Sequence, residues 1–405
     1  MGDRALITGI RGIEGTWPAP PARLSFSGMR DIGACPRRWS LTRASYPALW
    51  DGYGYPSRPN VASIVGNVVH ECLESIVLAL VQNNTTSVEG AAAVGVLRSL
   101  GGYPAVIRKA LDHQVDGLAS NPRLEGRMDQ LRRDLWARVP EIRQTVQTLL
   151  STSVLVGREG WDGRGPCSGT IPSGNLRSQE TSNGSFPEIS LTSSRLGMTG
   201  RLDLVSVDGS SVHIIDYKTG VPRAHHIDQM RIYALLWWLR DDVDPSRPYA
   251  TRLTLSYPGH DLDVQVPTAA ELSALEISTK AQLEQLRRDI DMDPPEARPD
   301  QDTCRFCPVR HLCDPYWSYI SGTPPVDGFA DVRGRVASRN GPKSWLLIPE
   351  DGQQVVLRCA DESTEFELDS WLRVVSAAVN IEPDTGGYVA SIVSGSEVFV
   401  EDTSG

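Results

Sequence analysis

Asp216 and Lys218 are the residues best suited to chemistry, because only Tyr217 separates them in an apolar segment that begins at Ile214. This segment predicts a β-strand. Alternate side chains of a strand share a face, so we expect Asp216 and Lys218 to point together and Tyr217 to point away. Asp203, in the preceding apolar segment, supplies a second carboxylate. If the two segments form a hairpin, both acids and the ammonium group meet at one end of a sheet.

Two carboxylates in one place repel each other unless a cation lies between them, and a divalent ion with oxygen ligands suits that position. A bound ion of this kind lowers the pKa of a water ligand and polarises a phosphodiester. The lysine adds a positive charge for the attacking water or the phosphate. An isolated Asp-x-Lys pair is more often an ordinary surface ion pair, so the other motifs decide between the two interpretations.

The hydrophobic pattern predicts the elements that position these residues. Residues 197–207 and 212–217 have the pattern of strands, and Asp208-Gly209 between them is typical of a hairpin turn. A second strand pair is predicted at 251–257 and 262–266. Helical spacing of apolar residues predicts further elements: helices at 27–34, 61–82, 225–240 and 269–291, and a helical layer at 84–153 in which 125–150 is the clearest helix.

Polar residues on two of these helices add to the candidate site. His70 lies at the edge of the apolar stripe of helix 61–82, where a histidine is more often simply packed. Gln229 and Tyr233 lie one helical turn apart and, by themselves, indicate a buried polar pair. Whether these residues belong to an active site therefore depends on the other motifs of the chain.

Taken together and in this order, the motifs resemble those of the RecB-like branch of the PD-(D/E)XK nucleases. That branch includes the RecB and AddB nuclease domains and the CRISPR-associated RecB-type exonucleases. The resemblance implies an α/β fold, with a mixed-sheet nuclease core that contains a helical insertion. It rests on four matching segments: Gly66-Asn67-Val68-Val69-His70-Glu71, Gly200-Arg201-Leu202-Asp203, Asp216-Tyr217-Lys218 and Gln229-Met230-Arg231-Ile232-Tyr233.

The resemblance also implies a role for each matching residue. Lys218 would assist the attack of water on the phosphodiester, together with the catalytic aspartates. Gln229 and Tyr233 would position the site or the DNA. The metal ion, Mg²⁺ or Mn²⁺, would be bound by a defined ligand set: His70, Asp203, Asp216, the backbone carbonyl of Tyr217 and, as a further candidate before the Asp203 strand, Glu188.

Cysteines form a second pattern, Cys304-x2-Cys307-x5-Cys313, with Cys35 as the candidate fourth member. Seven cysteines, an odd number, argue against a disulfide framework. Four thiolates can hold either zinc or an iron–sulfur cluster. The three-plus-one arrangement resembles the family's iron–sulfur staple and implies a [4Fe–4S] cluster. Cys72 is expected in the core, and no role is assigned to Cys167 or Cys359.

Composition divides the chain into three predicted parts. These are an N-terminal arm at 1–23, a nuclease domain at 24–322 that carries the cysteine loop 304–313, and a small C-terminal β-barrel at 326–405, OB-like, with about six short strands. Residues 157–187 are rich in Gly, Ser, Asn and Pro and predict a mobile loop within the nuclease domain. Thr323-Pro324-Pro325 marks the boundary with the barrel.

Charge is unevenly distributed. The formal net charge is −10, but residues 325–405 hold 14 acidic and 6 basic residues, so the rest of the chain is close to neutral. Arg37 and Arg38 are candidate phosphate contacts, although ordinary surface arginines fit almost as well. Trp345 or Trp371 of the barrel could stack on single-stranded bases. The acidity of the barrel instead favours docking of a partner protein.

We therefore predict an Mg²⁺- or Mn²⁺-dependent deoxyribonuclease that acts on DNA with single-stranded portions or ends, in bacterial repair, recombination or defence. A structure-specific endonuclease on the same core is one alternative. The other is a non-catalytic DNA-binding or scaffold subunit of a helicase–nuclease or defence complex. No apolar h-region occurs near the N-terminus and no run of about 18 apolar residues occurs, so we expect a cytoplasmic protein without a membrane partner.

Overall fold

The computed structural model describes residues 7–10, 17–157, 183–241, 248–321, 328–381 and 388–401. Most of the loop predicted at 157–187, with Cys167, lies outside these residues. The end of that range is not a loop, because strand β2 (Gly184–Ser193) begins within it. Its composition concealed the strand, which is ordered by pairing with its neighbour more than by its own β propensity.

The central sheet has five strands in the order β2-β3-β4-β5-β6. β3 (Met198–Asp208) and β4 (Ser211–Tyr217) form the first predicted hairpin, and β5 (Arg252–Tyr257) and β6 (His260–Val264) form the second. β4 and β5 run parallel, and helix α8 (Ala224–Leu239) is the crossover that a parallel pair requires. The predicted mixed sheet is confirmed.

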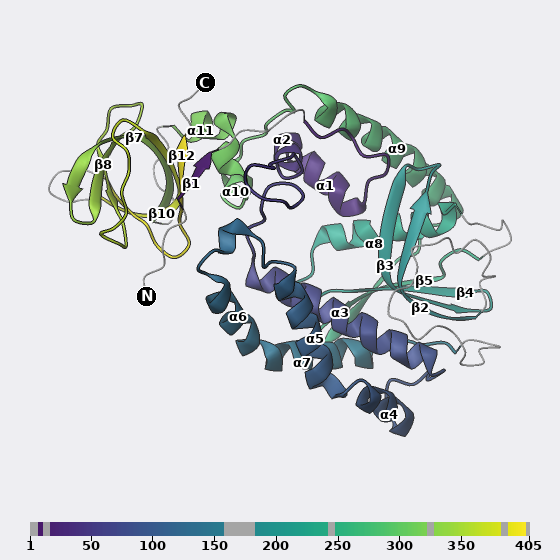
Figure 1. The fold of residues 1–405 in the computed structure, drawn as a ribbon. Coiled ribbons are helices and arrows are strands. Elements are labelled where there is room, and N and C mark those ends of the chain that lie inside the picture. Colours follow the sequence, from purple (N-terminus) through teal and green to yellow (C-terminus); the bar gives the residue numbers. More distant parts are fainter. Residues whose placement is uncertain are drawn as a thin grey trace.

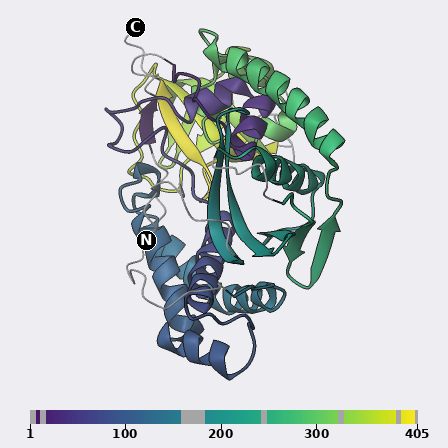
Figure 2. The same cartoon turned by 90° about the vertical axis from the view of Figure 1, so that its right-hand side faces the viewer.

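Helices cover both faces of this sheet (Figures 1 and 2). Alternate residues of β4 enter two separate cores. Val212 and Ile214 pack with α8 and with two further helices, α1 (Phe26–Ala34) and α9 (Ala269–Asp291). Ile215 and Tyr217 pack with α3 (Val61–Gln82) and the helical layer beneath it. The site residues of β4 therefore lie between two packed layers.

Helix α3 is the only helix among the described residues that is long and apolar enough to cross a membrane, judged by length and composition. Its Asn60 cap accepts the Ala62 N–H, and eleven of its residues are buried against the rest of the protein. Burial between the sheet and the helical layer accounts for its apolar composition.

The helical layer contains α4 (Ala91–Ser99), α5 (Gly102–Asp116), α6 (Met128–Ala137) and α7 (Val139–Ser151), with a 3-10 turn at Pro122–Leu124. The single helix predicted at 125–150 is wrong, because α6 ends at Ala137 and α7 begins at Val139. Pro140 causes the break, since it lacks the N–H that a continuous helix needs there but fits the first turn of a new one.

Short helices carry the cysteine pattern between the nuclease core and the barrel (Figure 1). These are α2 (Pro36–Leu41), α10 (Gln301–Cys304), a 3-10 turn at Arg310–Leu312, and α11 (Asp314–Ile320). Cys35 is the N-cap of α2, and Cys313 is the N-cap of α11. The cysteines thus lie at helix ends, where the chain turns.

The C-terminal part confirms the predicted small barrel. Five strands close on themselves in the order β7-β8-β9-β11-β10, because β10 pairs with β7 as well as with β11, and β9 and β11 run parallel. Their bounds are β7 (Phe329–Gly341), β8 (Ser344–Ile348), β9 (Val355–Arg358), β10 (Trp371–Ile381) and β11 (Tyr388–Ser391).

Two further strands extend the barrel sheet. β12 (Glu397–Glu401) pairs with β10, and β1 (Ile7–Ile10) pairs with β12 in parallel. The arm predicted at 1–23 thus contains a strand that joins the C-terminal sheet, and no local pattern indicated this pairing.

Trp345 lies inside the barrel and packs edge-on against Phe366. The expectation that Trp345 stacks on single-stranded bases is therefore wrong. Trp371 is half-buried, and the Arg333 guanidinium lies 4.7 Å from its ring centroid.

Buried polar contacts join the barrel to the rest of the chain. Arg123 of the helical layer forms a two-pronged ion pair with Glu397 of β12, with N–O distances of 2.9 and 2.6 Å. Both side chains are almost fully buried. Arg310, on the cysteine loop, pairs with Asp331 of β7. His311 stacks on Phe399 of β12 with ring centroids 3.8 Å apart. The barrel therefore packs against the cysteine loop.

Candidate metal centre and active site

Three potential metal ligands come together from three different elements. The β2–β3 register places Glu188 directly opposite Asp203. His70 of α3 approaches the same place, with its Nδ1 3.5 Å from Asp203 Oδ2. One ligand atom from each of the three residues lies within 4.8 Å of the other two. This spacing is suitable for a single ion coordinated by all three.

Asp216 of β4 and Lys218, which follows the last residue of that strand, lie beside this cluster. Lys218 Nζ lies 2.6 Å from Asp216 Oδ2 and donates a hydrogen bond of 2.9 Å to Gln229 Oε1. Gln229 in turn donates to the Tyr233 hydroxyl at 2.7 Å. Helix α8 therefore holds the lysine through a chain of two side chains one turn apart.

Tyr217 connects the two halves of the site through its backbone. Its N–H donates to Asp203 Oδ2 at 2.6 Å, which fixes that carboxylate. Its side chain points to the opposite face, where its hydroxyl and that of Ser153 are 2.7 Å apart. The alternation of side chains expected for a strand is therefore observed at the site.

Crowded carboxylates and burial explain the electrostatics. Burial and then Asp203 raise the pKa of Asp216 to about 7, although Lys218 opposes the shift. Burial and Asp203 also raise the pKa of Glu188 to about 7. Burial disfavours protonation of His70, but Asp203 outweighs it and raises the pKa to about 9. The shared cause is uncompensated negative charge, which a divalent cation would relieve.

Glu188 is held in an unusual conformation. Its φ of 52° lies in the left-handed region, which costs a residue other than glycine about 1–3 kcal/mol. Arg201 of β3 forms an ion pair with Glu188 and a second one, of 3.1 Å, with Glu74 of α3. The surrounding structure thus directs this carboxylate into the cluster.

Two glycines permit the close packing around the site. A Cβ at Gly200 of β3 would lie 2.8 Å from Leu236 Cδ1 and 3.3 Å from Tyr233 Cε1. A Cβ at Gly66 of α3 would lie 3.2 Å from Thr219 Oγ1. Both glycines belong to the segments that carry the motifs, so their absent side chains let α8 and α3 approach the strands.

The donor set fits a hard divalent cation. An imidazole nitrogen and several carboxylate oxygens suit Mg²⁺ or Mn²⁺ better than a soft thiophilic metal. When bound, such an ion lowers the pKa of a water ligand and polarises a phosphodiester. His70, Glu188 and Asp203 would hold it, with Asp216 at its edge. Lys218 would bear a positive charge toward the substrate.

The four patterned cysteines form a separate cluster. Cys35, Cys304, Cys307 and Cys313 line one enclosed cavity of about 20 Å³, and none of them forms a disulfide. The Arg38 and Asp300 N–H groups each lie 3.4 Å from a cysteine sulfur. Burial raises the pKa of the Cys307 thiol to about 12. A buried four-sulfur set with N–H donors fits a metal cluster that would stabilise thiolates.

Arg37 and Arg38, predicted as phosphate contacts, are engaged elsewhere. Arg37 donates to the Pro295 carbonyl at 2.7 Å and its guanidinium lies over Trp17. Arg38 lines the cysteine cavity and pairs with Asp31 at 3.7 Å. Both arginines therefore stabilise the segment around Cys35.

The sequence-based prediction missed Arg201 and Glu74 as the residues that hold Glu188. Arg201 stands in the motif segment 200–203, and that position was the one available signal. Its partners are remote in sequence and could not be identified without the fold.

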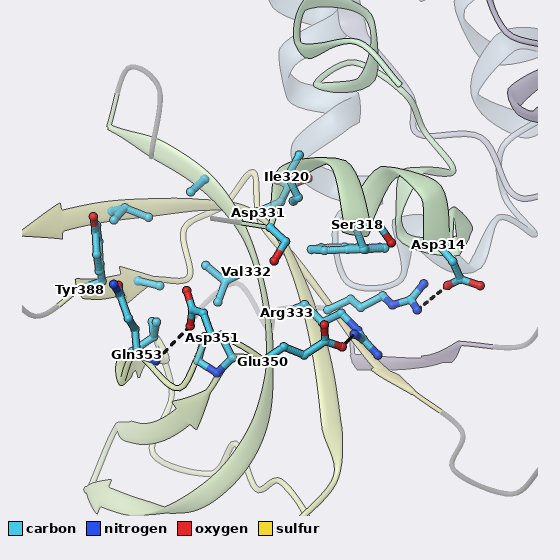
Figure 3. Close-up of a pocket in the computed structure, with 18 residues that line it drawn as sticks. Asp314, Ser318, Ile320, Asp331, Val332, Arg333, Glu350, Asp351, Gln353 and Tyr388 are labelled. Carbon is cyan, nitrogen blue, oxygen red and sulfur yellow. Dashed lines mark hydrogen bonds and ion pairs between the residues drawn. The ribbon is translucent and has the colours of Figure 1, made fainter. Parts of the chain in front are cut away.

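A second hollow, of about 360 Å³, lies between α11 and the barrel (Figure 3). Apolar side chains from both, among them Ile320 and Val332, line it, and acidic residues such as Asp314, Glu350 and Asp351 stand around it. It shares no lining residue with the Asp203 cluster and contains none of the predicted catalytic residues.

Comparison with known proteins gives one informative match. The model of the PD-(D/E)XK nuclease superfamily matches residues 23–314. No curated protein matches the chain.

Similar solved structures include that of SSO0001, with 18% identity and a TM-score of 0.21, covering 33% of this chain and 61% of that chain, less than two thirds of its length. The p204 HINb domain has 12% identity and a TM-score of 0.18, covering 49% and 85%. A murine DNA-binding protein bound to double-stranded DNA has 9% identity and a TM-score of 0.17, covering 53% and 90%. These scores are too low to inform the fold or the function.

Proposed function

Because this chain belongs to the PD-(D/E)XK nuclease superfamily, we propose that it is an Mg²⁺- or Mn²⁺-dependent deoxyribonuclease of the RecB-like branch. The observation that supports this most is the convergence of His70, Glu188 and Asp203 within 4.8 Å, beside the Asp216–Lys218 pair. A non-catalytic scaffold would have no need to keep this crowded set of acids, which destabilises the fold unless a cation is bound.

Each residue of the site has a role in this proposal. His70, Glu188 and Asp203 would bind the ion, with Asp216 at its edge, and the Tyr217 N–H holds Asp203 in position. Lys218 directs its ammonium group at the attacking water or at the phosphodiester oxygens, where it stabilises the negative charge that develops during hydrolysis. Gln229 and Tyr233 keep the lysine in that orientation. The substrate is DNA with single-stranded portions or ends, in repair, recombination or defence.

The decisive experiment is a cleavage assay with anaerobically purified protein. End-labelled linear single strands, circular single strands and blunt duplexes are each incubated with Mg²⁺ or Mn²⁺. Asp216→Asn and Lys218→Ala are expected to lower the cleavage rate at least about 100-fold, since each removes a group that acts on the reacting atoms. Lys109→Ala, on the exposed side of α5, is the matched control and should cleave like the parent. A Lys218→Ala protein as active as the parent contradicts the mechanism.

We also propose that Cys35, Cys304, Cys307 and Cys313 bind a [4Fe–4S] cluster. Their shared cavity and the absence of disulfides among them support this. Protein purified without oxygen should be brown and contain iron and acid-labile sulfide. Cys307→Ser should lose both, whereas Cys359→Ser, in the barrel core, should retain them. A zinc content of one ion per chain without sulfide would replace the cluster with a zinc site.

For the barrel we propose an OB-like fold that docks a protein partner with a basic segment. Four acidic residues line the hollow beside α11 (Asp314, Asp331, Glu350 and Asp351) against two arginines, Arg333 and Arg373, and this excess of negative charge supports a cationic occupant over a nucleic acid. A fluorescent arginine- and leucine-containing peptide should bind the parent. It should bind a Glu350→Lys/Asp351→Lys variant at least about 10-fold more weakly, through loss of charge complementarity. Equal binding of the two proteins contradicts the assignment.

A further inference from the structure

The mouth of the candidate active site is an open hollow of about 330 Å³ next to the metal ligands. His70 and Lys218 line its inner side, and Arg223, His225 and His226 line the side that leads onto α8. No aspartate or glutamate is among the residues that line it. The acidic metal ligands therefore lie behind this opening, and the side chains that line the opening itself are cationic or neutral.

Arg223 lines this opening, and Arg30 of α1 lies near enough to lower the pKa of His225 and His226. Arg30 of α1 and Arg223 are exposed, and neither forms an ion pair within the part of the chain that the structure describes. Other exposed arginines do, for example Arg252 with Asp263 at 3.1 Å and Arg335 with Asp369.

Lys218, Arg223, His225 and His226 lie close together, because all four line the same hollow and the two histidine rings have centroids 4.5 Å apart. After burial, Lys218 is the largest influence that lowers the pKa of His226, followed by His225, Arg223 and Arg30. Burial and then Arg30 and Arg223 lower the pKa of His225. Asp228 acts on His225 in the opposite direction, but its effect is smaller than theirs. Positive potential thus accumulates over the opening.

The wall of the hollow is also rigid. His226 Nδ1 lies 2.7 Å from the Tyr257 hydroxyl, and Tyr257 is buried and stacks on His260 with ring centroids 5.0 Å apart. The histidine beside Arg223 is therefore fixed by the sheet. A fixed wall with unpaired cations is suited to binding an extended anion without rearrangement.

We infer that Arg30, Arg223 and His225 form a phosphate-binding rim that holds the DNA backbone beside the phosphodiester to be cut. This inference rests on the proposed function and names the part of the site that grips the substrate. Because backbone phosphates are the same in every sequence, the rim gives binding without sequence preference. Arg37 and Arg38, predicted as phosphate contacts, are not among the residues that line this hollow.

The test is DNA binding without cleavage. A fluorescein-labelled oligothymidine of about 20 nucleotides, longer than the roughly 4–16 nucleotides that one OB fold covers, is titrated by anisotropy in buffer without divalent cations over a range of salt concentrations. Arg30→Gln/Arg223→Gln is compared with Arg252→Gln/Arg335→Gln, which removes the same charge from paired surface positions. Thermal unfolding of each variant verifies that it is folded.

The rim variant is expected to bind at least about 10-fold more weakly at 0.1 M salt, with a slope of log Kd against log salt smaller by about 1 to 1.5, because two phosphate contacts are lost. In steady-state cleavage it should raise KM and leave kcat within about threefold, as expected when uniform binding is lost. The control variant should bind with the slope of the parent.

Three outcomes overturn the rim: unchanged binding by its variant, equal weakening in both variants, or no DNA binding by the parent. The rim and the proposed function fail separately. If the parent binds but does not cleave, and the rim variant loses binding, the rim stands and the nuclease activity fails. If the parent cleaves and the rim variant binds normally, only the rim fails.

Discussion

At the scale of single residues, Glu188 is held in the candidate metal site by its neighbours. Arg201 forms an ion pair with its carboxylate, and its backbone adopts a left-handed φ of 52°. Its partner became evident from the register of β2 with β3, which places it opposite Asp203. A cross-strand pair of this kind depends on a strand that the sequence did not indicate.

Glu188→Gln should raise the Mn²⁺ concentration for half-maximal cleavage at least about 10-fold, because it removes a charged ligand from the cluster. The rate at saturating Mn²⁺ should change less. Metal titration of the cleavage rate, together with Mn²⁺ binding followed by electron paramagnetic resonance, measures both. Glu74→Gln is the matched control, since Glu74 shares Arg201 but is not one of the three clustered ligands. An equal shift in both variants argues that Glu188 acts only through Arg201.

His213 predicts a pH-dependent stability that is independent of the active site. It is buried on β4, its Nε2 lies 2.8 Å from Thr254 Oγ1, and burial followed by Arg252 lowers its pKa to about 4. The folded state therefore binds fewer protons than the unfolded state between that value and about 6.5. Stability from the neutral ring is fully present above pH 6.5 and is lost as the pH falls toward 4.

Between pH 7.5 and pH 5 the parent should lose roughly 2 kcal/mol more of its free energy of unfolding than His213→Gln does. Urea unfolding at several pH values measures the difference. Parallel pH profiles of the two proteins would show that His213 does not contribute.

At the scale of elements, the sequence was most informative where periodicity and turn chemistry agree. The β3–β4 hairpin, α3, α8 and α9 were predicted near their observed bounds, and the C-terminal part was predicted as the short strands of a small barrel. The long helix at 125–150 was wrong at one place, where Pro140 outweighs an otherwise continuous helical pattern. β1 was missed because it is ordered by pairing with β12, which is remote in sequence, and β2 was missed because its loop-like composition hides its pairing with β3.

Gly200 tests the packing between β3 and α8. Gly200→Ala should lower the free energy of unfolding by about 1–3 kcal/mol, since the new methyl group would collide with Leu236 in a filled core. Cleavage should fall as well, because Tyr233 must move and it holds Gln229 and through it Lys218. Gly95→Ala, in α4 with open space around it, should instead stabilise by about 0.5–1 kcal/mol. Urea unfolding of both variants decides, and a Gly200→Ala protein as stable as the parent contradicts the packing argument.

At the scale of the whole molecule, a few buried ion pairs connect parts that the sequence suggested were separate. The sequence predicted a nuclease core and a barrel but could not show their interface, because Arg123 and Glu397 are 274 residues apart. The acidic residues counted in the C-terminal part are not all available to a partner. Glu397 pairs with Arg123, and Asp331 pairs with Arg310.

Arg123→Met should lower the free energy of unfolding by about 3–5 kcal/mol, because it removes the two-pronged partner of buried Glu397 and leaves only Arg58, 3.9 Å away. Arg123→Met/Glu397→Met should recover much of that loss, since two apolar side chains replace the pair. Arg138→Met, which breaks a surface pair with Glu141, is the control and should cost less than about 1 kcal/mol. Urea unfolding measures all three, and additive losses in the double variant would argue against coupling.

Because the barrel packs against the cysteine loop, oxidation of a cluster bound there would affect the position of the barrel. Arg310 and His311 contact the barrel from within the same ten residues that carry three of the four cysteines. Loss of an iron–sulfur cluster in air would therefore also release the barrel from the cysteine loop. The protease resistance of residues 328–401 would then decline together with the brown colour. In a preparation that is inactive after aerobic handling, the barrel would then have separated from the nuclease core before any catalytic residue was altered.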